Sequence, residues 1–409
     1  MWNTRSSLLS FFQQRASLQI MQLKRKYHEL SFLDYGNPSE VLEYVKNDCG
    51  LLSDSSLQEK ALHIQFLYSP INPADLNIIE GRYPDPKTLH FPSRCNVRRV
   101  GGGEGIARIV NVDDGIVDAA GEILNVGDFV FPNMPGFGTW RSDAFVSGDE
   151  VRKICMPLNQ KLNSFHNDNS SDFDDLLMRA STMSVNPCTA YRMTHDFENL
   201  STGDVVVQNG GASSVGIAVS QLLHSRGIKT ISIVRKGNRS TQHFDKLQRY
   251  LQEIGKATIV IDEKELSPKY LKTLISSISS NEPKLGLNCI GGESATTIAK
   301  VLAHSGTLVS YGGMSKLPVT IPTGLLIFRN IKCVGYWQSR YSIENALCKE
   351  RSEMLSNIGT MILDGTLKTR TRALFELNDF KSAFRKSNTS SAEDDNTLPG
   401  KVLFKCSSW

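Results

Sequence analysis

The stretch from Asp204 to Gly216 reads Asp-Val-Val-Val-Gln-Asn-Gly-Gly-Ala-Ser-Ser-Val-Gly, and the predicted fold is built outward from it. Three consecutive valines are typical of a buried strand. A glycine-rich turn follows at once, and an amphipathic helix is expected to begin near Ser213. A second apolar run, Thr230 to Val234, comes next and ends at Arg235. This order of strand, glycine turn, helix and strand predicts a βαβ unit.

The glycine turn matches a dinucleotide-binding fingerprint in part. Aligned to G-x-G-x-x-G, Gly211 takes the first position and Gly216 the third, while Ser213 replaces the second glycine. Glycines let the backbone approach a pyrophosphate closely, and the free N–H groups at a helix start favour its charge. The turn therefore predicts a pyrophosphate site. A tight turn without a ligand is the alternative.

The end of the second strand indicates which dinucleotide would bind. An NAD site places Asp or Glu there, whereas this chain has no carboxylate from Ser225 to Thr241. The corner instead carries four residues of a basic loop: Arg235, Lys236, Gly237 and Arg239. Cations at this corner fit a 2′-phosphate, so NADP(H) is predicted over NAD(H). A solvated basic loop is the alternative.

Composition limits the classes of protein to consider. At 409 residues, two domains are expected, with 40% hydrophobic and 22% charged residues. No stretch approaches the roughly 20 apolar residues that a membrane span needs. The net charge is +4, but the first 27 residues hold five basic residues and no acid. The remaining chain carries 41 basic and 42 acidic residues, which argues against a nucleic-acid-binding surface.

Residues 1–27 are predicted to be a mitochondrial targeting segment, because they are rich in Ser, Gln and Arg and lack Asp and Glu. A disordered basic tail or a nuclear signal is the alternative. The eight cysteines form no C-x-x-C pair, so neither a structural zinc lobe nor a disulfide framework is expected. No metal is predicted.

The pattern of strands and helices predicts two unlike domains in an α/β fold. From Leu62 the chain is β-rich, and Asn159 to Asp175 is interpreted as a polar loop leading into a helix. After the glycine turn, strands alternate with helices, which indicates a doubly wound parallel sheet. The predicted domains are residues 28–185, a dinucleotide-binding domain at 186–345, and a return to the first domain at 346–409.

Several motifs resemble those of one family. They are Ile71-Asn-Pro-Ala-Asp-Leu-Asn, Gly81-Arg-Tyr-Pro, Phe137-Gly-Thr-Trp-Arg, Ser184-Val-Asn-Pro-Cys-Thr-Ala-Tyr, Tyr311-Gly-Gly-Met and Gly335-Tyr-Trp. On these motifs the chain resembles the zinc-free medium-chain dehydrogenase/reductase superfamily, and within it the mitochondrial trans-2-enoyl-CoA/acyl-carrier-protein reductases. The resemblance implies a Rossmann-type domain plus a β-rich GroES-like catalytic domain, and a homodimer.

The chain departs from the family pattern at Tyr336-Trp337, which replaces a Phe-Trp pair, and at two further places. Gly103 stands where zinc alcohol dehydrogenases carry His and where the zinc-free enoyl reductases usually carry Asn. Lys236-Gly237 replaces the last two residues of an Arg-Asp-Arg motif. These two further departures bear on metal binding and on NADPH affinity, respectively.

The resemblance also implies roles for individual residues. Tyr83 would be the catalytic residue, and the substrate pocket would include Asn72, Trp140 and Trp337. The alternative for both tryptophans is a place in the core. The alternative is a packing or turn role for Tyr83, a turn role for Asn186 and a solvated strand position for Lys401. The implied cofactor contacts are Asn186, Gly211, Ala212, Ser213, Ser214, Val215, Gly216, Arg235, Lys236, Gly237, Arg239, Tyr311, Gly312, Gly313, Met314, Tyr336, Trp337, Gln338 and Lys401.

The predicted function is NADPH-dependent reduction of trans-2-enoyl thioesters, carried on CoA or acyl-carrier protein, in mitochondrial fatty-acid synthesis in the matrix. Hydride goes to the β-carbon, the thioester oxygen gains negative charge, and a proton must reach the α-carbon. A tyrosine can donate without carrying charge at neutral pH. The alternatives are an NADPH:quinone reductase of the same fold, and an NADPH-holding regulatory or nucleic-acid-binding module.

Overall fold

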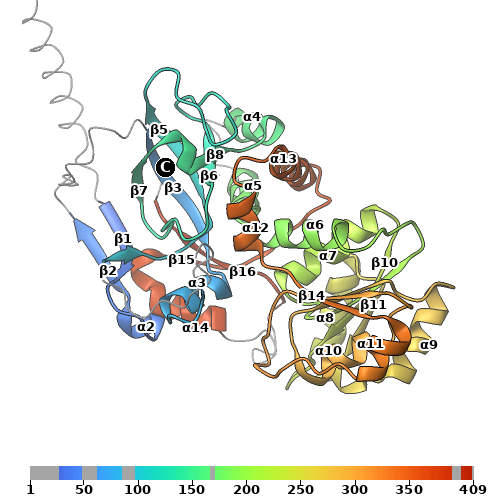
Figure 1. Cartoon of the computed structure of the whole chain (residues 1–409). Helices are drawn as coiled ribbons and strands as arrows, with labels where there is room; N and C mark the ends of the chain where they lie inside the picture. Colours follow the sequence, from blue (N-terminus) through green and yellow to red (C-terminus); the bar gives the residue numbers. More distant parts are fainter. Residues whose placement is uncertain (1–26, 48–61, 85–96, 166–170, 389–397, 408–409) are drawn as a thin grey trace, which may run out of the picture.

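The computed structural model describes residues 27–47, 62–84, 97–165, 171–388 and 398–407, which form two domains lying side by side (Figure 1). The predicted targeting segment lies outside these residues except for Tyr27, where strand β1 begins. None of the helices in the described ranges is long and apolar enough to cross a membrane.

The second domain is built on a six-stranded sheet in which every pair of neighbours is parallel. The strand order is β11-β10-β9-β12-β13-β14. In chain order this is 3-2-1-4-5-6, the doubly wound arrangement that binds dinucleotides. Its strands are β9 (Val205–Asn209), β10 (Lys229–Val234), β11 (Ile259–Asp262), β12 (Leu285–Asn288), β13 (Thr307–Ser310) and β14 (Lys332–Gly335).

Strand β9 shows why this sheet needs helices on both faces. All five of its residues are buried, as the three valines predicted. Val205 and Val207 pack into one apolar cluster and Val206 into another, because alternate side chains point to opposite faces. The covering helices are α7 (Ser214–Ser225), α8 (Thr241–Glu253), α9 (Pro268–Ile278), α10 (Gly292–Ala299) and α11 (Thr323–Arg329). The predicted α/β fold class is confirmed.

The first domain is β-rich. Its main sheet contains β3 (Leu62–Pro70), β5 (Ile106–Val112), β6 (Phe129–Pro132), β7 (Asp143–Val146), β8 (Val151–Lys153), β15 (Thr371–Glu376) and β16 (Lys401–Lys405). A small sheet holds β1 (Tyr27–Phe32), β2 (Glu43–Asn47) and β4 (Arg99–Val100). Short helices α2 (Pro38–Val41), α3 (Pro73–Ile79) and α14 (Phe380–Asn388) accompany the two sheets. Strand β16 pairs antiparallel with β3, so the end of the chain returns to the domain that its beginning builds.

Helices α4 (Met156–Ser164), α5 (Ser171–Ala180), α6 (Asn186–His195), α12 (Gln338–Glu344) and α13 (Lys349–Leu363) lie between the main sheet and the second domain (Figure 1). The prediction of a loop from Asn159 to Asp175 is therefore wrong at residues 159–164 and 171–175, which are helical, while residues 166–170 lie outside the described ranges. Leu158 and Leu162, four residues apart, are both buried on one face of α4. Asn159 looks like a loop residue, but its amide accepts from the Phe129 N–H at 2.9 Å and donates to Asp128 at 2.8 Å.

Candidate active site

The glycine turn lies between β9 and α7, where a cofactor phosphate would sit. Ser213 is the N-cap of α7 and accepts the Gly216 N–H at 3.0 Å. A Cβ on Gly216 would lie 2.6 Å from the Gly210 carbonyl oxygen, and one on Gly211 would lie 2.6 Å from the Ser232 Cβ. Both positions therefore exclude any side chain. The turn presents backbone N–H groups at a helix start, which fits a pyrophosphate.

The basic loop after β10 has one exposed cation and one that is folded back. Arg235 is exposed, whereas Arg239 is buried and donates to the Arg235 and Lys236 carbonyl oxygens, both at 3.1 Å. The Lys236 N–H donates to Asp262 at 3.0 Å, a carboxylate from the end of β11 that sequence spacing did not reveal. Positive charge at this corner fits an NADP 2′-phosphate, with Arg235 as its most accessible member.

Two further segments with predicted cofactor contacts follow strands β13 and β14. Tyr311 follows β13, and its phenol is buried against Cys289 and Ser213, so burial raises its pKa well above the ordinary value. Gly312, Gly313 and Met314 follow it, and the Met314 side chain is exposed. After β14, the Tyr336 hydroxyl donates to Gln338 Oε1 at 2.6 Å. The structure thus brings Ser213 and Tyr311 together from segments about a hundred residues apart.

Tyr83 stands on the turn after α3, where Gly81 has φ +69°. The Trp337 indole N–H donates to the Tyr83 hydroxyl oxygen, and the Ser339 hydroxyl lies 3.2 Å from it. The Tyr83 and Trp337 rings meet edge to face with centroids 5.5 Å apart. Burial raises the pKa of Tyr83, the negative charge of Asp75 adds to this, and the two hydrogen bonds oppose it. Sequence reasoning did not find Ser339.

A buried polar cluster ties Asn72 to Asn186 and Lys401. The Asn72 Oδ1 accepts from the Lys401 ammonium and from the Asn186 amide, the latter at 3.2 Å. Its Nδ2 donates to Glu104 at 2.8 Å, and Glu104 also accepts the Val185 N–H at 2.8 Å. The Asn72 side-chain amide therefore joins three predicted site residues, and it adds Glu104, to which the sequence analysis gave no role.

A cavity of about 520 Å³ opens beside Tyr83. Its wall combines apolar and polar residues, and Asp75 and Ser339 are among the polar ones. The apolar and aromatic lining includes Phe32, Tyr35, Ile78, Ile79, Pro84, Val100 and Phe137. Three arginines complete the wall: Arg98, Arg99 and Arg141. A cavity of this size lies within the range of small-molecule sites, and its wall offers both apolar and charged contacts.

Trp140 has a different place from the predicted pocket wall. It is fully buried, and its ring contacts Phe384 and Phe404 at centroid distances of 5.6 and 5.3 Å. Its indole N–H donates to the Pro70 carbonyl at 3.4 Å, and the residue does not line the cavity beside Tyr83. The core alternative therefore describes Trp140. Asn72 likewise is occupied within the polar cluster rather than in the cavity wall.

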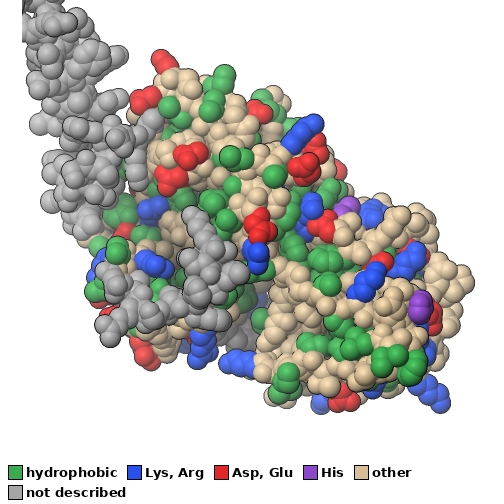
Figure 2. Space-filling view, in the orientation of Figure 1, with side chains coloured by type: hydrophobic (Ala, Val, Ile, Leu, Met, Phe, Trp, Pro, Cys, Tyr) green, Lys and Arg blue, Asp and Glu red, His purple; other side chains and the backbone are tan. Residues whose placement is uncertain are grey.

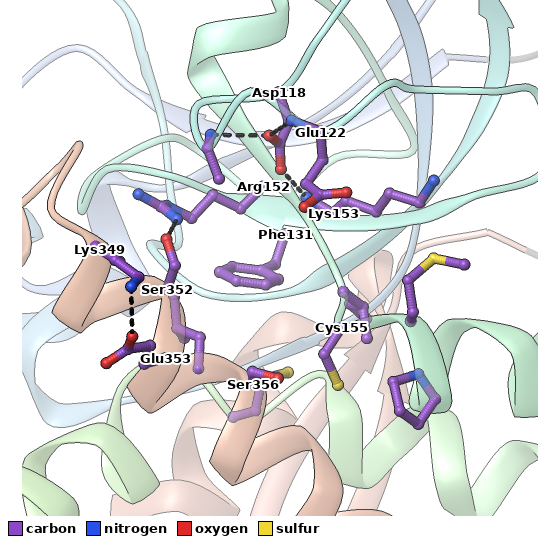
Figure 3. Close-up of a pocket in the computed structure, with 16 residues that line it drawn as sticks. Asp118, Glu122, Phe131, Arg152, Lys153, Cys155, Lys349, Ser352, Glu353 and Ser356 are labelled. Carbon is purple, nitrogen blue, oxygen red and sulfur yellow. Dashed lines mark hydrogen bonds and ion pairs between the residues drawn. The ribbon is translucent and has the colours of Figure 1, made fainter.

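A second cavity, of about 400 Å³, lies between β8, α4 and α13 (Figure 3). Phe131 and Cys155 line it, and Lys349 pairs with Glu353 at its rim at 3.5 Å. The Asp118 carboxylate there accepts the backbone N–H groups of Ala120, Glu122 and Lys153, each at 2.8 Å. No predicted site residue lines this cavity.

The glycine-turn Rossmann sheet and the β-rich partner domain define a medium-chain dehydrogenase/reductase. A family model described as zinc-binding dehydrogenase matches residues 214–356. Gly103 offers no ligand, however, and both Glu104 carboxylate oxygens accept hydrogen bonds. In the described ranges, no group of three or more His, Cys, Asp or Glu could hold a metal. The residues present do not fit a catalytic zinc ion.

Two curated relatives identify the family within the medium-chain dehydrogenase/reductases to which the chain belongs. The mitochondrial enoyl-acyl-carrier-protein reductase of Dictyostelium discoideum is 35% identical over 378 residues, covering 91% of this chain and 95% of the relative. The Homo sapiens enzyme of the same name is 35% identical over 353 residues, covering 86% and 83%. The chain belongs to this family of mitochondrial enoyl-acyl-carrier-protein reductases.

Solved structures agree. A mitochondrial 2-enoyl thioester reductase heterodimer from Candida tropicalis has a TM-score of 0.76 and 31% identity, covering 93% of this chain and 100% of that one. The Etr1p/NADP/crotonyl-CoA complex has a TM-score of 0.75 and 30% identity, with the same coverage. The predicted family, its NADPH cofactor and its enoyl-reductase chemistry are confirmed by these comparisons.

Proposed function

We infer that this protein reduces the double bond of trans-2-enoyl thioesters with NADPH. The observation that carries this conclusion is the position of Tyr83, which lines a cavity of about 520 Å³ with both apolar and charged walls, in a chain of the enoyl reductase family. The glycine turn and Arg235 would hold the cofactor, with Asn186, Tyr311 and Lys401 as further predicted contacts. Bound NADPH supplies the hydride that the β-carbon receives.

Tyr83 is suited to meet the thioester oxygen. The Trp337 indole can only donate, so the Tyr83 oxygen is the acceptor and its own proton remains free for another partner. The Ser339 hydroxyl lies 3.2 Å from the same oxygen, and either hydroxyl can donate to the other. Because the pKa of Tyr83 is raised, the phenol stays neutral at physiological pH. It can therefore stabilise the developing oxyanion and deliver a proton to the α-carbon.

The cavity beside Tyr83 would hold the acyl chain. The apolar part of its wall matches a hydrocarbon, and its volume is within the range of ordinary ligand sites. The carrier of the thioester would be CoA or acyl-carrier protein, whose phosphate groups are anionic. The arginines that line the cavity bring positive charge to this region.

The protein is mitochondrial, as its relatives are named, and the proposal places it in the matrix on account of its acid-free N-terminal segment. The proposal includes a homodimer. Strand β14 ends the order of its sheet and is exposed throughout. Apolar side chains are exposed on the surface of the second domain (Figure 2). Those of α11 and β14 are Leu326, Ile327, Phe328 and Val334.

One assay tests the proposed reaction. NADPH oxidation is followed by absorbance with a short trans-2-enoyl-CoA, with the same acyl group on acyl-carrier protein, and with a quinone. Turnover of the enoyl thioesters, with NADH much poorer, is the expected result. Turnover of the quinone alone would make the protein a quinone reductase. Tight NADPH binding without any turnover would leave a regulatory module.

A further inference from the structure

Three ionisable side chains are buried together next to Tyr83. Asp75, Glu104 and Lys401 are 5, 1 and 6% exposed. They come from α3, the loop before β5, and β16, so residues far apart in sequence meet at one point. None of the three was needed for the mechanism above, apart from the predicted cofactor contact of Lys401.

This cluster contains two carboxyl groups and one ammonium group, and its other hydrogen-bonding groups are neutral. Asp75 accepts the Asn72 N–H at 2.8 Å, and Glu104 accepts from Asn72, Ser184 and Val185. All of these donors are neutral. Among the residues that the structure describes, Lys401 is the one cation of this cluster, and it donates to Asn72. Two carboxylates thus share a single buried ammonium.

A buried charge without a counter-charge is costly, and an ionisable group in that position takes up or releases a proton instead. With both carboxylates ionised, the cluster would carry one uncompensated negative charge. The less costly state keeps one proton on a carboxyl group. Burial, together with the nearby Glu104 charge, raises the pKa of Asp75 to about 7, against the opposing effects of backbone N–H groups and of Lys401.

Asp75 is also the carboxyl group that reaches the cavity. It lines the same cavity as Tyr83, and its charge acts on the Tyr83 phenol. Glu104 does not line that cavity and is held on both oxygens. The titratable and charged groups that face Asp75 are Glu104, Lys401 and Tyr83, with Arg98, Arg99 and Arg141 in the cavity wall.

We propose that Asp75 supplies the proton that restores Tyr83 after each turnover, an inference that rests on the proposed function. When the α-carbon forms its new C–H bond, the Tyr83 O–H bond breaks and leaves a phenolate. The Asp75 carboxyl proton passes through cavity water to that phenolate, and the resulting carboxylate is reprotonated from solvent. One proton is consumed in each cycle, as the overall reduction requires.

The test substitutes Asp75→Asn, which keeps an acceptor for the Asn72 N–H and leaves Glu104 and Lys401 as a balanced pair. Asp75→Glu retains an acid. The matched control is Asp118→Asn, another buried carboxylate that accepts backbone N–H groups but lines the second cavity (Figure 3). For each protein, kcat and KM are measured across pH with the enoyl-CoA. Urea unfolding is measured across pH without cofactor.

For the wild-type and D118N proteins, kcat should fall as pH rises through about 7, because Asp75 then loses its proton. For D75N, kcat should be lower by about 100-fold and should lack that pH dependence, while the KM for the enoyl-CoA changes little. D75E should keep part of the activity and a shifted pH dependence. An unchanged kcat and pH profile in D75N would overturn the proposal, as would a D75E that behaves like D75N.

Unfolding of the cofactor-free protein gives an independent result. A carboxyl group whose pKa is higher in the folded state stabilises least when pH is high. The wild-type protein should therefore lose stability relative to D75N between about pH 4 and 7, and the absence of that difference would overturn the proposal. The unfolding measurement does not depend on turnover. A failure of the proposed function is therefore recognised separately, because the wild-type protein would then reduce no enoyl thioester.

Discussion

The Tyr83 hydroxyl receives one hydrogen bond from Trp337 and has Ser339 as its second neighbour. Replacing Tyr83 with Phe keeps the ring against Trp337 but removes the proton and the oxyanion contact. We expect kcat for the enoyl thioester to fall about 100-fold, with NADPH affinity unchanged. Stopped-flow or steady-state NADPH oxidation measures the loss. Tyr270→Phe, on the exposed surface of α9, is the control. An unaltered kcat in the Tyr83 variant would remove this residue from the mechanism.

Trp140 belongs to the core, so its substitution should affect stability and not substrate binding. A Cβ on Gly101 or Gly102 would lie 2.4 and 2.5 Å from the indole, which shows how closely the ring fills this space. We expect Trp140→Ala to lower the free energy of unfolding by about 3–5 kcal/mol. Urea unfolding measures this. A selective rise in the KM for the enoyl thioester, with stability retained, would instead place Trp140 at the pocket.

Individual site residues were predictable where a motif fixes a backbone position, and less so where a side chain can adopt several orientations. The glycine-turn motif alone was enough to predict the positions of Gly211 and Gly216. Arg239 was expected to face the cofactor, yet it folds back onto two carbonyl oxygens of its own loop. Asp262 reaches the same loop from a neighbouring strand. Such cross-strand contacts depend on tertiary packing, which spacing along one chain does not encode.

At the scale of elements, the first turn of α7 leaves no room for a side chain at Gly216. A methyl group there would meet the backbone of Gly210 and Gly211, which cannot rotate away. We expect Gly216→Ala to cost roughly 1–3 kcal/mol in strain and to raise the Kd for NADPH about tenfold or more. Titration of NADPH fluorescence measures the Kd.

Gly324→Ala in α11 is the matched control, because the new methyl would meet only Phe328 at an ordinary 3.6 Å. Its NADPH affinity should equal that of the wild-type protein. Equal affinity in the Gly216 variant as well would mean that the turn does not position the pyrophosphate.

Strands with a continuous apolar run were predicted well, whereas segments that mix polar and apolar residues were not. Strand β9 begins at the three valines, and β10 begins one residue before the predicted run from Thr230 to Val234. Helix α4 was missed because its polar residues resemble a loop, although Leu158 and Leu162 anchor it. Strands β1 and β2 were not predicted either, since they pair with each other and with the two-residue β4 in a small separate sheet.

For the whole molecule, the exposed edge at β14 and α11 is the proposed dimer surface. Phe328 is 79% exposed, which is unusual for an aromatic side chain unless a partner covers it. We expect Phe328→Glu to produce a monomer, measured by size-exclusion chromatography with light scattering. Leu347→Glu, at an equally exposed leucine outside this surface (78%), should leave the dimer intact. A monomeric wild-type protein would remove the dimer from the proposal.

The pairing of β16 with β3 has a consequence for how the protein matures. Residues 62–105 are made early, but the ammonium that completes their buried cluster arrives with Lys401, near the end of the chain. Until then β3 lacks one neighbour and Glu104 lacks its cation, which leaves an open strand edge in a chain still being synthesised or translocated. The Rossmann sheet, in contrast, draws all its strands from 205–335 and can close on its own. Cofactor binding can therefore precede the assembly of a competent catalytic centre, which waits for the last residues to dock.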